Sequence, residues 1–210
     1  MMTQRFLARV DYRPSMSAGS AAIGNRVVYE APSVSRPHGV PALTIWTKPG
    51  TAGLALPDNS GFILGTLFER NNSTPLDAVP EWFAQAPIED RATLLTDRFW
   101  GGYIACWTTG DNVVVHRDPS GAIPCYCVCL DRCILFATDV DMLLESRMFA
   151  PEIDWRALTE QLIAIQYRTD ATCLSGVIEV AQGSSVLCSA TGLKHQRHWS
   201  PWDFGSRERQ

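Results

Sequence analysis

The amino-acid sequence predicts an α+β fold in which helices cover antiparallel sheets. Short runs rich in β-branched and aromatic residues dominate the chain, and Gly, Pro, Asn or Asp bounds each of them. Two links between consecutive runs are short enough to be hairpin turns, and a hairpin joins antiparallel strands. Helical periodicity appears in only three places. Such segments pack as helix layers on antiparallel sheets.

The strand pattern covers most of the chain. The expected strands are 5–12, 25–30, 42–47, 61–67, 101–107, 112–117, 125–130 and 133–138. The sequences TTGDN at 108–112 and LDRC at 130–133 predict hairpin turns. Two further short strands about a Gly-containing turn are expected within 176–193. Side chains alternate along a strand, so Cys106 is expected to be buried if Gly102 and Ile104 point inward.

Three helices are expected, at 88–99, 139–147 and 154–166. Asp139 and Asp154 stand where N-cap residues belong. In the third helix Arg156 and Glu160 are expected on the solvent side. An apolar stripe at helical spacing is expected to pack on the protein; its residues are Trp155, Leu158, Leu162 and Ile165.

Composition limits the class of protein. The chain has 210 residues, 46% of them hydrophobic and 19% charged, which is typical of a folded protein with one substantial core or two small domains. A net charge of −4 gives no basic surface for nucleic acid. No apolar run approaches the roughly 18 residues of a membrane span. The N-terminus lacks the apolar region of a signal peptide. These features predict a cytoplasmic protein without nucleic-acid or membrane partners.

Seven cysteines raise the possibility of a metal site. Cys125, Cys127, Cys129 and Cys133 lie close together in sequence, but their spacing lacks the C-x2-C pairs of zinc sites. Residues 125, 127 and 129 share one face of a strand. Cysteine commonly behaves as a small buried hydrophobe. We therefore expect reduced thiols in the core and no metal.

One long segment carries a family resemblance. Residues 94–127, LLTDRFWGGYIACWTTGDNVVVHRDPSGAIPCYC, resemble the centre of the glutaminase-type N-terminal domain of asparagine synthetases, a class II glutamine amidotransferase domain of the Ntn type. The family pattern Arg-Asp-x-x-Gly-x-x-Pro-x-Tyr falls on Arg117, Asp118, Gly121, Pro124 and Tyr126. LFATDVDMLL at 135–144 and the stretch 176–203 resemble the segments that follow in this family.

Three short motifs are most similar to the lasso-peptide cyclase branch of that family. They are Asp-Pro-Ser-Gly at 118–121, Trp-Gly-Gly-Tyr at 100–103 and Trp-Ser-Pro-Trp-Asp at 199–203. The resemblance extends over about 85–204. It implies a glutaminase-like domain over 1–204, followed at 205–210 by a disordered tail or the start of a missing synthetase domain.

The resemblance implies a fold and a chemistry. The fold is an Ntn-hydrolase-like four-layer αββα sandwich of two antiparallel sheets flanked by helices. In active members an N-terminal Cys attacks the glutamine side-chain amide, an Asn-Gly pair binds the oxyanion, and an Arg and an Asp hold the amino-acid head group. Ammonia then passes to an ATP-dependent synthetase domain.

This sequence departs from the active pattern. The first cysteine is Cys106, in mid-strand, and Leu64 stands where the oxyanion-binding Asn is wanted, beside the matching Gly65. Leucine offers no donor, and losing one oxyanion donor costs about 10²–10³ in rate. The Gly-Ser-Asp clamp is missing after Gly65, and RPHG at 36–39 has the letters of the His-Arg-Gly motif in another order. We expect no catalytic residue, apart from Thr3 as a remote candidate nucleophile after removal of Met2.

Arg117 and Asp118 allow two interpretations. In a structural turn, Arg117 pairs with a carboxylate and Asp118 binds backbone amides two residues on. Alternatively, the pair contacts a neighbouring synthetase domain. Gly65 is retained as a candidate binding position. His195 and His198 have a spacing that can hold metal on a helix, but LKHQRHWSP is not helical in pattern, so a solvated tail is expected.

The sequence leaves three functions open. The favoured one is a degenerate, non-catalytic domain of a lasso-peptide cyclase, whose partners are a synthetase (cyclase) domain or subunit, a precursor peptide and a leader-peptide protease. No Ser-Gly-Gly-x-Asp-Ser loop occurs, so ATP and Mg²⁺ are expected only in the missing synthetase domain. The alternatives are an active glutamine-hydrolysing subunit that supplies ammonia, and an independent binding module.

Overall fold

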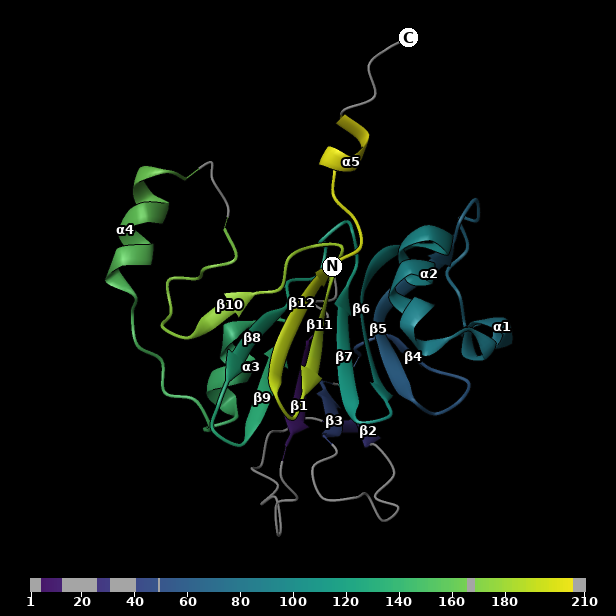
Figure 1. The fold of residues 1–210 in the computed structure, drawn as a ribbon, viewed down its shortest axis with the longest axis horizontal. Coiled ribbons are helices and arrows are strands. Elements are labelled where there is room, and N and C mark those ends of the chain that lie inside the picture. The colour runs from purple at the N-terminus through teal and green to yellow at the C-terminus, as the bar shows by residue number, and fades with distance from the viewer. Residues whose placement is uncertain (1–4, 13–25, 31–40, 49, 166–168, 206–210) are drawn as a thin grey trace. The chain divides into compact units, whose positions relative to one another are not determined.

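The computed structural model describes residues 5–12, 26–30, 41–48, 50–165 and 169–205. Within these ranges the chain forms two six-stranded sheets and short helices, and every strand pairing is antiparallel (Figure 1). The chain divides into two compact units, each built on one sheet. The expected α+β fold class with two antiparallel sheets is confirmed. The assignment of 1–204 to one domain stays a prediction.

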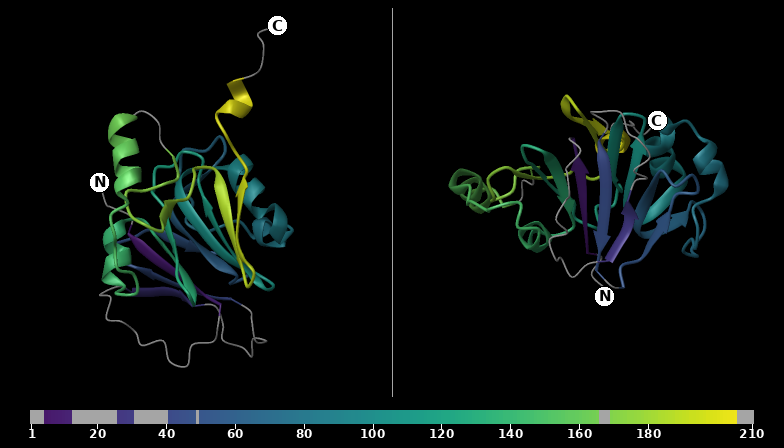
Figure 2. Two further views of the ribbon diagram at one scale, coloured as in Figure 1. Left: turned by 60° about the vertical axis from the view of Figure 1, so that its left-hand side comes forward. Right: turned by 90° about the horizontal axis from the view of Figure 1, so that it is seen from below.

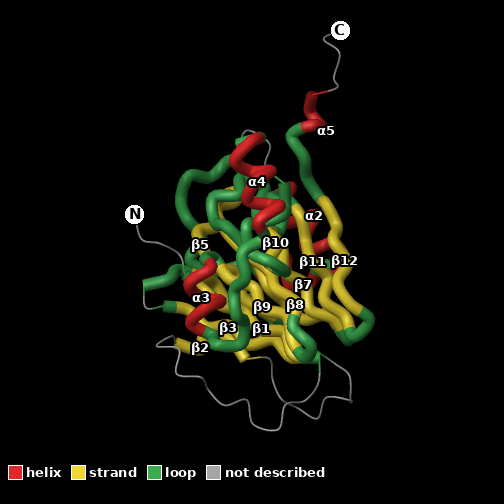
Figure 3. Tube along the Cα trace, turned by 90° about the vertical axis from the view of Figure 1, so that its left-hand side faces the viewer, coloured by secondary structure: helices red, strands yellow, loops and turns green. Residues whose placement is uncertain are grey.

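Unit 1 comprises residues 1–51 and 124–180. Its sheet has the order β10-β8-β9-β1-β3-β2. The strands are β1 Phe6–Asp11, β2 Arg26–Glu30, β3 Ala42–Thr47, β8 Tyr126–Cys129, β9 Cys133–Ala137 and β10 Val177–Glu179; the helices are α3 Val140–Glu145 and α4 Trp155–Ile163. Figure 3 shows α3 beside the strands, where Met142 and Leu143 pack on Leu7 and Leu135 in the core of this unit.

Unit 2 comprises residues 52–123 and 181–210, and its sheet has the order β12-β11-β7-β6-β5-β4. The strands are β4 Gly53–Ala55, β5 Gly61–Glu69, β6 Phe99–Thr109, β7 Asn112–Arg117, β11 Ser184–Ser189 and β12 Gly192–Arg197; the helices are α1 Glu81–Gln85, η1 Ile88–Asp90, α2 Arg91–Arg98 and α5 Trp202–Gly205. Phe83 and Leu95 from α1 and α2 pack against Tyr103, Trp107 and Val114 of the sheet.

The strand predictions are largely confirmed. All eight runs form strands, and both hairpins occur: Thr109 pairs with Asn112, and the N–H of Leu130 donates to the carbonyl of Cys133 at 2.9 Å. Cys106 is buried as expected. Tyr103, Ala105 and Trp107 on the opposite face of β6 are buried as well, because β6 lies between two strands of the sheet and α2 packs on it.

The two short strands predicted about a Gly-containing turn in 176–193 are present as β10 and β11, with Gly183 between them, but they do not pair with each other. They belong to different sheets, since β10 pairs with β8 while β11 pairs with β7 and β12. The expected solvated tail is wrong, because 192–197 forms β12. Sequence patterns do not report which strand a segment pairs with, and the exposed polar residues of β12 lack the alternation of a half-buried strand.

The helix predictions hold for position and capping, but not for burial. The Asp139 and Asp154 side chains accept hydrogen bonds from the N–H groups of Met142 and Ala157, so both are N-caps. Three of the four stripe residues on α4 are exposed, Trp155 to 68%, Leu162 to 71% and Ile165 to 81%, whereas Leu158 is half-buried. Figures 1 and 2 show α4 clear of the strands of its own unit. Periodicity identifies an apolar face but not what covers it.

The prediction of which side chains of α4 face the solvent is confirmed. Arg156 donates to Glu160 at 2.9 Å, one helical turn along, and both side chains are exposed. Among the helices that the structure describes, none is both long enough and apolar enough to cross a membrane.

Candidate functional site

Of the residues in the family pattern, Arg117, Asp118 and Gly121 lie in unit 2, at the end of β7 and in the turn after it, and the candidate Gly65 lies on β5 of the same unit. Pro124 and Tyr126 belong to unit 1. Asp118 begins the turn after β7 and is fully buried. Its carboxylate accepts hydrogen bonds from the N–H groups of Ser120 at 2.7 Å, Gly121 at 3.1 Å and Tyr103 at 3.3 Å, and from the Ser120 hydroxyl. The expectation that Asp118 binds backbone amides two residues on is confirmed. Burial nevertheless raises the pKa of the Asp118 carboxyl, although these hydrogen bonds oppose the shift.

Arg117 holds the same turn from its other side. Its guanidinium donates from Nε to the carbonyl of Ile123 at 2.9 Å and from Nη2 to the carbonyl of Gly121 at 3.1 Å. Gly121 has φ +63, and a Cβ there would lie 2.8 Å from the side chain of Gln182. The turn is therefore built from a buried Arg-Asp pair that satisfies its own backbone. A carboxylate partner of Arg117 stays a prediction.

Gly65 is the candidate binding glycine of β5, and its N–H is already engaged. It donates to the carbonyl of Ala52 at 2.9 Å, just before β4. Gly65 has φ +107, and a Cβ would lie 2.2 Å from the carbonyl oxygen of Gly102 on β6. Only glycine fits this conformation and this close approach. The sequence signal at Gly65 thus reflects strand packing.

Leu64 lies beside Gly65 and is buried, with 1% of its surface exposed. Its backbone pairs with Ile104 on β6 and with Gly53 on β4. Strand β4, which the sequence did not indicate, thus lies along the segment of β5 that holds the candidate positions Leu64 and Gly65. Neither the Leu64 side chain nor the Gly65 N–H is available to bind a developing negative charge.

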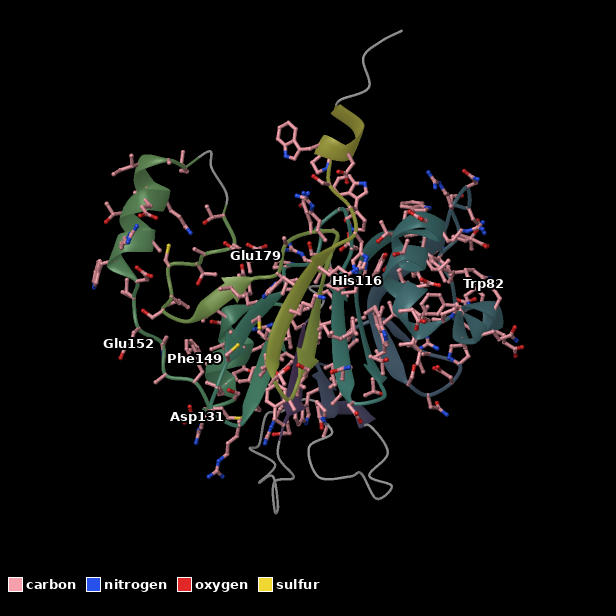
Figure 4. All side chains as sticks on the ribbon, in the orientation of Figure 1. Trp82, His116, Asp131, Phe149, Glu152 and Glu179 are labelled. Carbon is pink, nitrogen blue, oxygen red and sulfur yellow. The ribbon has the colours of Figure 1, made fainter. Side chains whose placement is uncertain are left out.

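A chain of hydrogen bonds that sequence reasoning missed joins β7, β11 and the segment after β12. The Nδ1 atom of His116 lies 3.0 Å from the Ser185 hydroxyl, which lies 3.0 Å from Nε2 of His198. His116 and Ser185 are buried, and His198 is half-buried. Figure 4 shows His116 among the strands of unit 2. His198 is thus a partner of the sheet rather than part of a solvated tail, whereas His195 on β12 is exposed.

His116 is held in its neutral form. Burial, and secondarily the neighbouring His198, lower the pKa of His116 to about 3. Burial also lowers the pKa of His198. The Nε2 atom of His116 has no hydrogen-bond partner among the described residues. No pattern links positions 116, 185 and 198 in sequence, because only the register of β7 with β11 brings His116 opposite Ser185.

Two expected positions lie outside the described residues: the candidate nucleophile Thr3, and the RPHG sequence at 36–39. Within the described ranges, no three His, Cys, Asp or Glu side chains are grouped so that they could hold a metal ion. The cysteines at 106, 125, 127, 133 and 188 are buried thiols, as expected for core residues, whereas Cys129 is exposed and Cys173 is half-buried.

Comparison with known families decides the assignment. Residues 91–199, slightly more than half of the chain, match the model of the glutamine amidotransferase domain. The chain belongs to the glutamine amidotransferase domain family. The two antiparallel sheets expected from the sequence are present in the residues that the structure describes, and the Ntn-hydrolase-like assignment stays a prediction. The finer assignment to the asparagine synthetase and lasso-peptide cyclase branches stays a prediction.

Two solved structures are similar to the amidotransferase domain. One is described as the allosteric regulatory enzyme of purine biosynthesis, with 12% identity and a TM-score of 0.47 over 94% of this chain and 43% of that one. The other is glutamine phosphoribosylpyrophosphate amidotransferase from B. subtilis complexed with ADP and GMP, with 10% identity and a TM-score of 0.41 over 94% and 44%. The chain thus spans less than half of either protein. No curated protein matches it in sequence.

Proposed function

We propose that this amidotransferase domain does not hydrolyse glutamine and serves as a docking domain of an asparagine-synthetase-type lasso-peptide cyclase. The observation that carries the proposal is that β5 offers no free hydrogen-bond donor at Leu64 and Gly65. The Gly65 N–H donates to the carbonyl of Ala52, and a buried leucine, Leu64, stands where a donor amide is needed. A tetrahedral intermediate would find no stabilising donors there, and such donors supply much of the rate in acyl transfer.

The cyclase assignment gives this loss a chemical reason. In the proposal, a synthetase domain with ATP and Mg²⁺ activates a side-chain carboxylate of a precursor peptide. The peptide's own α-amine then attacks the activated carbonyl and forms an isopeptide bond. An amine on the substrate replaces ammonia as the nucleophile, so no glutamine need be hydrolysed. The motifs at 100–103, 118–121 and 199–203 support this branch.

Exposed aromatic and apolar side chains support a docking role. Trp202 is 80% exposed and Trp199 is half-buried. The apolar face of α4, with Trp155 and Leu162, is exposed in the other unit. Large exposed apolar groups mark interaction surfaces. In the proposal the synthetase domain or subunit covers Trp202.

Ammonia release is the decisive assay. The purified chain is incubated with glutamine, and ammonia is measured against a buffer blank and against a glutaminase of known activity. We expect no release above the blank. Release that disappears in Thr3→Ala would overturn the proposal and identify an active amidotransferase with a threonine nucleophile. Release that persists in Thr3→Ala would also overturn it and require another nucleophile.

A further inference from the structure

Strand β8 ends in two thiols with opposite exposure. Cys127 is fully buried, whereas Cys129, two residues on, is exposed at the end of the strand. The two side chains lie on the same face, since side chains alternate along a strand. The Cys127 thiol hydrogen-bonds to the Cys129 sulfur. The two thiols therefore neighbour each other on one face of the strand, with Cys129 exposed to solvent and Cys127 buried.

The register of the sheet explains this difference. Strand β10 covers β8 only as far as Val128, which pairs with Val177, the first residue of β10. Cys127 pairs with Ile178 inside this region, and Cys129 lies beyond it. After Cys129 the chain turns into β9, and Figure 4 shows Asp131 at this end of the hairpin. A small reagent can approach the Cys129 sulfur here without opening the sheet.

The neighbouring thiol also prepares the Cys129 sulfur for reaction. The hydrogen bond from Cys127 lowers the pKa of Cys129 to about 7, so a large fraction is thiolate at neutral pH. The thiolate is the reactive form of cysteine towards peroxides and disulfides. The buried thiol of Cys133 in the same unit shows the opposite behaviour, because burial raises its pKa.

We propose that Cys129 and Cys127 form a peroxide-reactive dithiol site. The Cys129 thiolate attacks a hydroperoxide, its sulfur takes one oxygen and becomes a sulfenic acid, and the peroxide is reduced to water or an alcohol with uptake of one proton. The Cys127 thiol then attacks the Cys129 sulfur. The S–O bond breaks, the S–S bond forms, and water leaves with the thiol proton. A dithiol or other thiol reductant restores the pair by exchange.

The geometry indicates a reversible bond. Two residues along a strand span about 6.6 Å between Cα atoms, near the upper end of the range that a disulfide bridges. The bridge can form at a strand end with a small contraction, and a stretched disulfide is more easily reduced. Among the other cysteines, Cys125 and Cys133 are buried, and the half-buried Cys173 donates to Gln161 Oε1 at 3.1 Å.

Peptide mapping tests the site in the intact chain. The protein is treated with one equivalent of hydrogen peroxide, denatured, alkylated, and digested with chymotrypsin, which cuts after Tyr126 and Leu130. Cys127 and Cys129 then remain in one fragment, 127–130, separate from Cys125. We expect that fragment to escape alkylation and to be lighter than its dithiol form by two hydrogen atoms. Treatment with dithiothreitol after the peroxide and before alkylation should reverse both changes.

Variants separate the two roles. In Cys127→Ser we expect Cys129 to be trapped as a sulfenic acid by dimedone, and in Cys129→Ser we expect Cys127 to stay reduced. Cys173→Ser is the matched control and should behave like the wild type. A bond to Cys125, faster oxidation of Cys173, or dimers linked through Cys129 would each overturn the proposal. The wild-type map decides the question even if a variant fails to fold.

Discussion

Acid should destabilise this amidotransferase domain through a single buried histidine. His116 is fully buried, bonded to Ser185 at 3.0 Å, and neutral because its pKa lies at about 3. In the unfolded chain the same imidazole returns to its ordinary pKa of 6.5. Below pH 6.5 the unfolded state therefore binds a proton at His116, whereas His116 in the folded state stays neutral. The stabilising effect of neutral His116 is complete above pH 6.5 and is lost as the pH falls towards 3.

The size of the effect follows from the gap between the two pKa values. Each pH unit between them changes the free energy of unfolding by about 1.36 kcal/mol for one proton. Between pH 8 and pH 5 the loss through His116 amounts to about 2 kcal/mol. For a domain with an ordinary stability of about 5–15 kcal/mol, that is a large share.

Urea unfolding, followed by circular dichroism at pH 8, 6.5 and 5, measures this loss. The perturbation is His116→Gln, which removes the titrating group. Other groups with shifted pKa values, such as Asp118, titrate in both proteins and cancel in the difference. We expect the variant to lose about 2 kcal/mol less than the wild type between pH 8 and pH 5. His195→Gln removes an exposed histidine on β12 and should follow the wild type.

Parallel pH profiles for the wild type and His116→Gln would refute the reasoning, because they would mean that His116 takes up its proton equally in both states. If the variant does not fold, the wild type still provides a test. The ring of His116 should keep its neutral chemical shifts in NMR spectra down to pH 5, and a midpoint near the ordinary histidine value would contradict its burial.

Three other substitutions test the site. Asp118→Ala removes the side-chain acceptor of the Ser120, Gly121 and Tyr103 amides, of which Gly121 keeps the backbone carbonyl of residue 118, and should cost about 3 kcal/mol in urea unfolding, whereas Asp118→Asn should cost less. Gly65→Ala places a Cβ 2.2 Å from a carbonyl at φ +107 and should cost on the order of 3 kcal/mol more than Gly110→Ala, which meets open space; equal costs would contradict the close approach. Trp202→Phe should remove an emission component that resembles tryptophan in water and is open to acrylamide; a protected component would show that Trp202 is covered.

The fold was predictable where a local pattern sufficed. Runs such as 112–117 and 133–138 appear as strands, and Asp139 and Asp154 cap their helices, because these features depend on neighbours within a few residues. The two strands in 176–193 were also predictable, but their membership of different sheets was not, because their pairing partners lie far away in sequence. The predicted burial of the apolar stripe on α4 was wrong because the apolar face of a helix does not reveal what covers it.

The site was predictable only in part, for a related reason. Arg117 and Asp118 were found through a turn motif whose contacts are local, so their structural role could be anticipated. The hydrogen bond that the Gly65 N–H donates to the carbonyl of Ala52 could not be anticipated, because nothing in the residues around β4 marks them as partners of β5. The hydrogen-bond chain from His116 to His198 likewise depends on strand register.

The residues through which the sequence resembles its family hold its backbone together. Asp118 binds three backbone N–H groups, Gly121 adopts φ +63, and Gly65 allows two strands to approach. Each would be needed for folding whether or not glutamine is hydrolysed. A match to these positions therefore identifies the fold, while activity depends on separate donors and a nucleophile. At Leu64 and Gly65 the fold is kept and the donors are absent or engaged, which is why we infer a docking domain instead of a glutaminase.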